Sequence, residues 1–177
     1  MRVTVTELVD NPGATRALSR AAAVEEFGEE AWGPAEGALR GDIQLALDLD
    51  AVVEGILVRG SVGVDLELPC GRCLTPQPVH VDSDVAELFV DPAKREDDDE
   101  EDPGYELIDD RTAIDLTTMV RDALLVDLPV RVLCREDCKG LCEVCGTDRN
   151  RHDCGHRPDA APDPRWAKLA DLDLPSE

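Results

Sequence analysis

The sequence predicts an α+β fold, in which an antiparallel sheet packs against an amphipathic helix and is followed by a cysteine-rich C-terminal segment. Three observations support this prediction. Apolar and polar residues alternate in short runs between residues 43 and 88, apolar residues recur at helical spacing from Leu116 to Leu128, and five of the seven cysteines lie within residues 134–156. The alternation indicates a sheet with one buried face, which either curls into a small barrel or lies under the helix.

Three alternating runs define the expected sheet. They are Ile43, Leu45, Leu47 and Leu49; Val62, Val64, Leu66 and Leu68; and Val79, Val81, Val85 and Leu88. Residues 52–58 are a candidate strand between the first two runs, and Arg59-Gly60-Ser61 is the expected turn before the second.

The segments outside these runs have weaker signals. Residues 2–9 alternate loosely and predict a short strand, residues 10–13 ("DNPG") predict a turn, and residues 14–27 ("ATRALSRAAAVEEF") contain good helix formers and predict a helix. Glycine and proline at short intervals predict a loop at 28–42. A second short helix is expected from Asp163-Pro164 to Ala170, with Trp166 packed against the rest of the protein.

A clearer amphipathic helix is predicted near residues 115–127. Asp115 is a suitable N-cap, Leu116, Val120, Leu124 and Leu128 share one face, and Pro129 ends the segment. We therefore expect a sheet domain at 1–130 and a metal-binding segment with the short helix at 131–177. The first of these contains a solvated acidic loop at 92–105, which includes the uninterrupted run "EDDDEED" at 96–102.

The cysteine spacing points to metal binding. From Cys134 the pattern is C-x3-C-x3-C-x2-C-x8-C-x-H, and the pair Cys142/Cys145 is followed by a glycine that lets the backbone turn around an ion. Thiolate and imidazole donors favour Zn2+, so residues 131–177 are interpreted as a zinc-knuckle segment. The upstream pair Cys70/Cys73 follows an expected strand rather than opening a helix, which favours a metal knuckle over a thioredoxin-like redox pair.

Seven cysteines and His156 supply donors for two tetrahedral sites. The favoured arrangement groups Cys70 and Cys73 with Cys134 and Cys138, and groups the remaining donors as Cys142, Cys145, Cys154 and His156. The alternative is a single zinc ion bound by Cys138, Cys142, Cys145 and Cys154. His80 and His152 are expected to be ordinary residues outside the sites.

Composition narrows the functional classes. No apolar stretch is long enough for a membrane span, and the N-terminus lacks the apolar block of a secretory signal, so we expect a cytoplasmic protein with reduced thiols and no membrane partner. The chain has 40 acidic and 18 basic residues and a net charge of −22, which favours basic partners and argues against DNA binding.

Several motifs occur in an order that resembles the YceD-like family, also called large ribosomal RNA subunit accumulation proteins. They are "CGRCL", "IDLTTMVRDALLVDLPV", "LCREDCKGLCEVCGTDRNRHDCGH" and "DPRWAKLADL", and the similarity covers roughly residues 40–172. Many relatives have Pro at position 143 and Asn-Leu-Asn at 148–150, and they often end the cluster with Cys where this chain has His156. An exchange of Cys for His retains a zinc ligand.

The resemblance implies a role in large-subunit ribosome biogenesis and implies no catalytic residue. The family's gene commonly lies beside that of a small zinc-containing ribosomal protein, which implies a basic ribosomal protein as a partner. The role in biogenesis makes pre-ribosomal large-subunit RNA the other expected partner, alone or together with that protein. The basic residues near the cysteines are candidates for phosphate contacts, and equally for a solvated face: Arg131, Arg135, Lys139, Arg149, Arg151 and Arg157. The sequence does not specify an oligomeric state.

Two other functional classes are alternatives to a non-catalytic assembly factor. A zinc hydrolase needs an open coordination position, and a thiol oxidoreductase needs a CxxC pair with a lowered thiol pKa. A sequence-specific DNA-binding zinc protein needs a basic helix. This chain has a pI of about 4.3, and its zinc segment shows no clear basic helix.

Overall fold

The computed structural model describes residues 1–28, 32, 38–94, 106–156 and 165. In this part of the chain the fold is mostly β, with two short α-helices and a C-terminal cysteine and histidine cluster. No helix in the described ranges is both long and apolar enough to cross a membrane.

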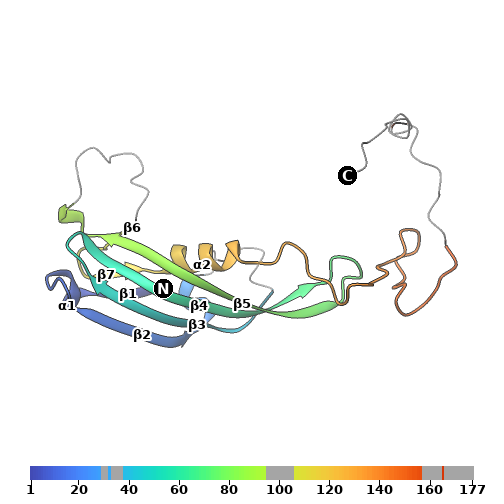
Figure 1. The fold of residues 1–177 in the computed structure, drawn as a ribbon, viewed down its shortest axis with the longest axis horizontal. Helices are drawn as coiled ribbons and strands as arrows, with labels where there is room; N and C mark the ends of the chain where they lie inside the picture. Colours follow the sequence, from blue (N-terminus) through green and yellow to red (C-terminus); the bar gives the residue numbers. More distant parts are fainter. Residues whose placement is uncertain (29–31, 33–37, 95–105, 157–164, 166–177) are drawn as a thin grey trace, which may run out of the picture.

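The main sheet has five strands in the order β2-β3-β4-β5-β6 (Figure 1). The strands are β2 (Thr15–Ala22), β3 (Leu39–Ala51), β4 (Gly55–Pro69), β5 (Pro76–Val90) and β6 (Glu106–Leu107). The sheet is open rather than a closed barrel, and it is mixed rather than purely antiparallel because β5 and β6 pair in parallel. Two further strands, β1 (Arg2–Thr4) and β7 (Ala113–Asp115), form a separate antiparallel pair.

The predicted alternation is confirmed in the three long strands. In β3 the side chains of Ile43, Leu45, Leu47 and Leu49 are all buried, while most of the residues between them are exposed. Val62, Val64 and Leu66 of β4 and Val81 and Val85 of β5 continue the same inner face. These side chains form the core because only one face of the sheet is covered.

The turn predicted at Arg59-Gly60-Ser61 is wrong, because β4 runs through it as one strand. Residues 52–54 make the turn instead, and the inner-face series of β4 continues in step from Ile56 and Val58 to Val62. Gly60 occupies an inner position with φ of 144°, and a Cβ there would lie 2.0 Å from the carbonyl oxygen of Ala46. Here glycine marks a close approach of two backbones rather than a turn.

The helix predicted at residues 14–27 is also wrong. Residues 15–22 form β2, which pairs antiparallel with β3 from Thr15 opposite Asp50 to Ala22 opposite Ile43. A single turn of 3-10 helix follows, η1 (Val24–Phe27). Helix propensity is a weak preference, and pairing with the edge of β3 satisfies the backbone groups of both strands.

The N-terminal prediction holds only in part, because residues 2–9 contain β1 and then a short helix, α1 (Thr6–Val9). The amphipathic helix is confirmed as α2 (Thr117–Val126), which buries Met119, Val120 and Leu124. Asp115 lies one residue before the observed N-cap, yet its Oδ1 still accepts a hydrogen bond from the Thr117 amide at 2.9 Å.

The predicted acidic loop and C-terminal helix lie largely outside the described residues. Of residues 92–105, only η3 (Pro92–Lys94) is described, and of residues 163–170 only Arg165. Most of the loop predicted at 28–42 is likewise outside, although β3 begins within it at Leu39.

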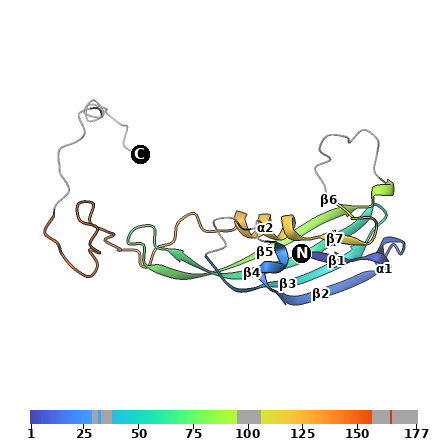
Figure 2. The ribbon, with the colours of Figure 1, turned by 180° about the vertical axis from the view of Figure 1, so that it is seen from behind.

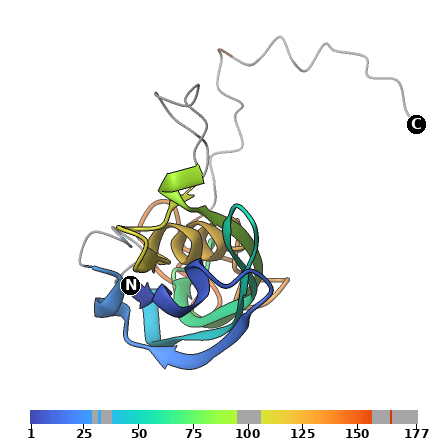
Figure 3. The ribbon, with the colours of Figure 1, turned by 90° about the vertical axis from the view of Figure 1, so that its left-hand side faces the viewer.

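The sheet curves around α2, as the view along the long axis shows (Figure 3). From behind, α2 again lies against the sheet, and the hairpin of β4 and β5 extends beyond the end of the helix (Figure 2). The chain that leaves α2 runs to the tip of this hairpin (Figure 1). The fold therefore brings residues 70–75 and 132–141 together away from the main core.

The close approach at Gly60 yields a stability prediction. Gly60→Ala should lower the free energy of unfolding by about 2 kcal/mol or more, because the methyl group meets backbone atoms that cannot move aside. Gly63→Ala is the matched control in the same strand, since the one tight contact of its Cβ would be with the end of the Asp82 side chain at 3.1 Å, and the nearest backbone atom, the Val81 oxygen, is at an ordinary contact distance of 3.4 Å. Chemical denaturation of both variants measures the difference, and equal effects would contradict the backbone contact.

Candidate metal centres

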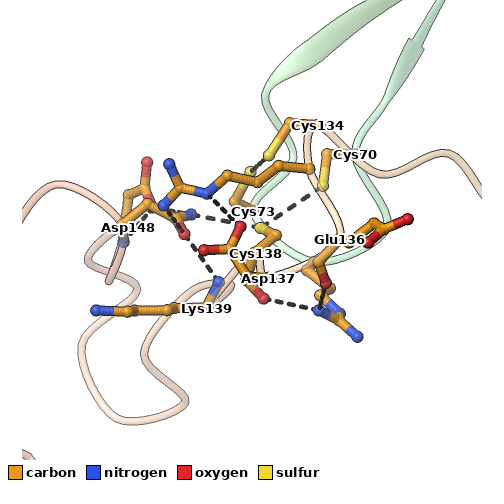
Figure 4. A network of polar contacts seen from close by, with 11 residues as sticks. Cys70, Cys73, Cys134, Glu136, Asp137, Cys138, Lys139 and Asp148 are labelled. Atoms are coloured by element: carbon orange, nitrogen blue, oxygen red, sulfur yellow. Dashed lines mark hydrogen bonds and ion pairs between the residues drawn. The ribbon is translucent and has the colours of Figure 1, made fainter.

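Two pairs of cysteines meet at the tip of the β4–β5 hairpin. Cys70 and Cys73 lie in the turn between the strands, and Cys134 and Cys138 lie in the chain after α2. Figure 4 shows the four thiol groups converging, and all four sulfur atoms lie within 4.8 Å of one another. The Sγ–Sγ distance is 3.9 Å for Cys70 and Cys138, and 3.6 Å for Cys73 and Cys134.

These distances fit metal coordination and not disulfide bonding. A tetrahedron with metal–sulfur bonds of about 2.3 Å has sulfur–sulfur edges of about 3.8 Å. A disulfide requires a sulfur–sulfur distance of about 2.05 Å. All seven cysteines are free of disulfide bonds. The first cluster, Cys70, Cys73, Cys134 and Cys138, therefore has both the donors and the spacing of a tetrahedral site.

The second cluster consists of Cys142, Cys145, Cys154 and His156, whose donor atoms also lie within 4.8 Å of one another. The Cys142 Sγ and His156 Nδ1 atoms are 3.8 Å apart. Cys142 is buried, but Cys145 and His156 are exposed, so this cluster is more open to solvent than the first.

The structure assembles the eight predicted side chains in the grouping that the sequence analysis favours. The four donors of the alternative with one zinc ion are not brought together. Cys138 lies with the first cluster and not with Cys142, Cys145 and Cys154. His80 and His152 belong to neither group. His80 Nδ1 instead contacts the carboxylate of Asp65 at 2.8 Å.

The turn at Cys70 is closed by two backbone hydrogen bonds. The Cys70 amide donates to the Thr75 carbonyl, and the Leu74 amide donates to the Cys70 carbonyl, both at 2.9 Å. Leu74 adopts φ of 60°, and the Thr75 hydroxyl lies 3.3 Å from the Cys73 sulfur. The backbone thus bends around the position where the two sulfur atoms converge.

The same turn recurs at the second CxxC pair. The Cys142 amide donates to the Thr147 carbonyl at 2.9 Å, and the Gly146 amide donates to the Cys142 carbonyl at 2.8 Å. Gly146 has φ of 70°, and the Thr147 hydroxyl again lies 3.3 Å from a sulfur, that of Cys145. The repeated signal is a threonine two residues after each CxxC pair, which the sequence analysis missed.

Arg72 joins the hairpin to the segment after α2. Its guanidinium donates hydrogen bonds of 2.9 Å to the carbonyls of Glu136 and Cys138, and its own carbonyl accepts one from the Leu141 amide at 3.1 Å. The residue lies between Cys70 and Cys73, so these bonds orient the loop that carries the other two thiols. Sequence reasoning gave no sign of this role.

Asn150 connects the two clusters. It follows Cys145 in the loop of the second cluster, yet its Nδ2 lies 3.4 Å from the Cys138 sulfur of the first. Its Oδ1 accepts hydrogen bonds of 2.8 Å from the Lys139 amide and from Arg135, and Asp148 accepts one from its Nδ2 at 2.7 Å. Side chains that hydrogen-bond to a ligand in this way commonly tune the affinity of a metal site.

The thiols within each cluster have divergent pKa values. Hydrogen bonds with the backbone of Cys73, Cys134 and Arg72 lower the pKa of Cys70 to about 6. Burial and the neighbouring Cys138 raise the pKa of Cys134 to about 12, since adjacent thiolates repel one another. In the second cluster, hydrogen bonds with Thr147 lower the pKa of Cys145 to about 6.

A divalent cation would remove the repulsion between adjacent thiolates by neutralising their charge. Four protein donors would complete its coordination in either cluster and leave no open position for a reacting water. The arrangement suits a structural site.

The turn geometry yields a prediction for stability. Leu74→Gly should raise the free energy of unfolding by up to about 1 kcal/mol, because glycine tolerates a positive φ and the leucine side chain is 60% exposed. Gly146→Ala is the opposite change at the equivalent position and should lower it by about 1 kcal/mol. Denaturant titration under reducing conditions measures both changes. A large fall in the free energy of unfolding of Leu74→Gly would show that the leucine side chain packs against the rest of the protein.

The chain is similar to several known proteins. The family model "Large ribosomal RNA subunit accumulation protein YceD" matches residues 58–173. An uncharacterized protein of Mycobacterium tuberculosis is 38% identical over 77% of this chain, which spans 63% of that relative's length. One from Mycobacterium leprae is 35% identical over 97% of this chain and 76% of its own length. One from Bacillus subtilis is 30% identical over 50% of this chain and 49% of its own.

No solved structure matches the chain. The family match covers well over half of the 177 residues and includes both CxxC turns, the helix α2 and every member of the two clusters. The chain is therefore a member of the YceD family of large ribosomal RNA subunit accumulation proteins.

Proposed function

We propose that this protein is a non-catalytic factor in large-subunit ribosome biogenesis that supports accumulation of the large ribosomal RNA. The family name supplies the process. The observation that carries the non-catalytic part is the pair of four-donor clusters, which would leave a bound ion no free coordination position. The protein would thus act by binding a partner.

Zinc is the ion that we assign to both clusters. Seven thiolates and one imidazole form a soft donor set, which favours Zn2+ over Mg2+ or Ca2+. Within the described ranges the apolar cluster at the hairpin tip is small, since beyond its three buried cysteines it includes only Leu133, Cys134 and Leu141. A structural zinc site can contribute on the order of 10 kcal/mol of folding free energy, enough to order a segment with so little core.

A basic ribosomal protein is the partner class that we favour. The net charge of −22 attracts cationic proteins and repels bare RNA at long range. Local RNA contact is the second candidate. It is supported by Arg131 and Lys139, which are exposed beside the first cluster and have no ion pair within the described part of the chain.

A thiol oxidoreductase is the rival enzyme class, and the lowered pKa values of Cys70 and Cys145 bear on it. A lowered pKa equally prepares a thiol to bind a metal. Cys70 is fully buried, which denies access to a disulfide substrate. Cys145 is exposed, but like Cys70 it has three further metal donors around it. Metal binding therefore accounts better for both values.

Zinc content tests the assigned ions. Protein purified under reducing conditions should contain close to two zinc ions per chain, and Cys145→Ser should lose about one because the clusters share no donor. His152→Ala, in the same loop, is the control and should retain both. Elemental analysis by mass spectrometry gives the counts, and a wild-type content near zero would exclude structural zinc.

A loss of both ions from Cys145→Ser would show that the sites are not independent. Asn150→Ala tests the link between the two clusters without removing a metal donor. It should retain two ions but weaken the first site by about tenfold in chelator competition, because Asn150 is a neighbour of the Cys138 sulfur and not a donor.

The proposed function is tested in cells that lack the protein. They should contain less large-subunit RNA relative to small-subunit RNA, and the wild-type gene should restore the ratio. The double variant Cys70→Ser, Cys73→Ser should not, because removing two donors releases the hairpin from the segment after α2 and costs several kcal/mol. His80→Ala is the control on the same hairpin. An unchanged RNA ratio in the deletion strain would refute the proposal.

Protein abundance must be measured beside the RNA ratio. A double variant that is scarce fails through lost folding, as the structural role predicts. One that is folded and abundant yet inactive would identify Cys70 and Cys73 as a contact surface, and full rescue would make the first cluster dispensable.

A further inference from the structure

A groove runs between the outer edge of the sheet and α2. It has a volume of about 710 Å3 and is lined by β5, β6 and α2. Among the described residues, the lining includes no lysine, arginine or histidine and contains five carboxylates, those of Asp84, Glu87, Glu106, Asp122 and Asp127. A groove of this size accommodates several side chains of a partner.

Most of these carboxylates form no ion pair with a described residue, although Arg121 lies near enough to Glu106 to interact with it electrostatically. Asp122 pairs with Arg121 at 2.7 Å, but Asp84, Glu87, Glu106 and Asp127 form no ion pair within the described residues. The charges also act on one another, because burial and then the negative charge of Glu106 raise the pKa of Glu87. A positively charged ligand would relieve this repulsion.

The groove also has an apolar component. Val85 and Met119 line it and are largely buried, while Val126 lines it at the end of α2 with 82% of its surface exposed. The groove therefore offers apolar as well as acidic surface to a partner. The combination of carboxylates and apolar side chains distinguishes this groove from an acidic surface that contacts only solvent.

The neighbouring strand edge offers backbone groups as well. β5 pairs with β4 along its whole length, but on its other side β6 pairs only with Phe89 and Val90. Within the described residues, the edge from residue 76 to residue 88 has no second strand partner. Such an edge binds extended polypeptide segments through main-chain hydrogen bonds.

We propose that this groove is the docking site for a basic segment of a protein partner, in which lysine or arginine residues alternate with apolar residues. The cationic side chains would meet the unpaired carboxylates, and the apolar ones would cover Val126 and Met119. That the partner is a ribosomal protein rests on the proposed function. That the groove binds a basic segment of this kind does not.

The test uses full-length, zinc-loaded protein and a fluorescent peptide of about ten residues in which lysine alternates with valine, a length that an exposed strand edge of this kind accommodates. Glu87→Gln, Glu106→Gln and Asp127→Asn are combined in one variant. The control is the triple variant Asp42→Asn, Asp48→Asn, Glu54→Gln, which changes the net charge equally at exposed positions outside the groove. Both variants should retain the wild-type melting temperature.

Fluorescence anisotropy at physiological salt should show the groove variant binding the peptide at least about tenfold more weakly than wild type, and the control within about twofold. Replacing valine by serine in the peptide should also weaken binding. Equal losses in the two triple variants would overturn the proposal, because they would show attraction by net charge alone. Absence of peptide binding to the wild type would overturn it too, while leaving the ribosomal RNA prediction standing.

Amide chemical shifts locate the peptide independently. On titration, shifts should concentrate in residues 84–87 and along α2. Shifts spread over the sheet, or centred on the cysteine clusters, would place the site elsewhere. Tighter binding of single-stranded RNA than of the peptide, lost in the same groove variant, would contradict a protein partner.

Discussion

The tip of the β4–β5 hairpin meets the segment after α2 at four converging sulfur atoms, and backbone hydrogen bonds such as that from the Gly71 amide to the Val132 carbonyl join the two segments. The pairs that approach each other are 61 and 68 residues apart in the chain, so each contact closes a long loop. Hydrogen bonds from Arg72 add to the attachment, but the apolar contact there is small. Without a cation the thiols conflict, as the opposite pKa shifts of Cys70 and Cys134 show.

This attachment explains the elongated shape of the molecule. The apolar core lies between the sheet and α2, and the cysteine clusters lie beyond it at the end of the hairpin (Figure 1). Asn150 then ties the second cluster to the first through Lys139 and Cys138. Asn150 thus links the loop of the second cluster to the first cluster, which lies at the tip of the hairpin.

The long strands and the metal donors were predictable from sequence because their signals are local. Alternation identified β3 and β5, and CxxC spacing with donor counting grouped the eight side chains as the structure does. β2 was missed because its alanine-rich sequence favours helix, and pairing with β3 decided otherwise. Gly60 resembles a turn residue in sequence, and only the distance to Ala46 reveals its reason.

Arg72, Asn150 and the acidic groove could not be predicted in the same way. Each depends on segments that meet only in three dimensions, such as Asn150 beside Cys138 or Glu87 beside Glu106. Arginine, asparagine and acidic residues are also common on ordinary protein surfaces, so their presence in the sequence does not indicate such a role. The threonines after the two CxxC pairs differ, since Thr75 and Thr147 stand at equivalent positions in the sequence and could have been recognised as a repeat.

X-ray absorption spectroscopy at the zinc edge tests the central claim most directly, because it reports the atoms bound to the ion. Seven sulfur donors and one nitrogen shared by two sites predict an average of 3.5 sulfur and 0.5 nitrogen ligands per zinc. The zinc–sulfur distance should be about 2.3 Å. A first shell dominated by oxygen or nitrogen, or one with a sulfur count near two, would show that the thiols do not hold the hairpin to the C-terminal segment through zinc.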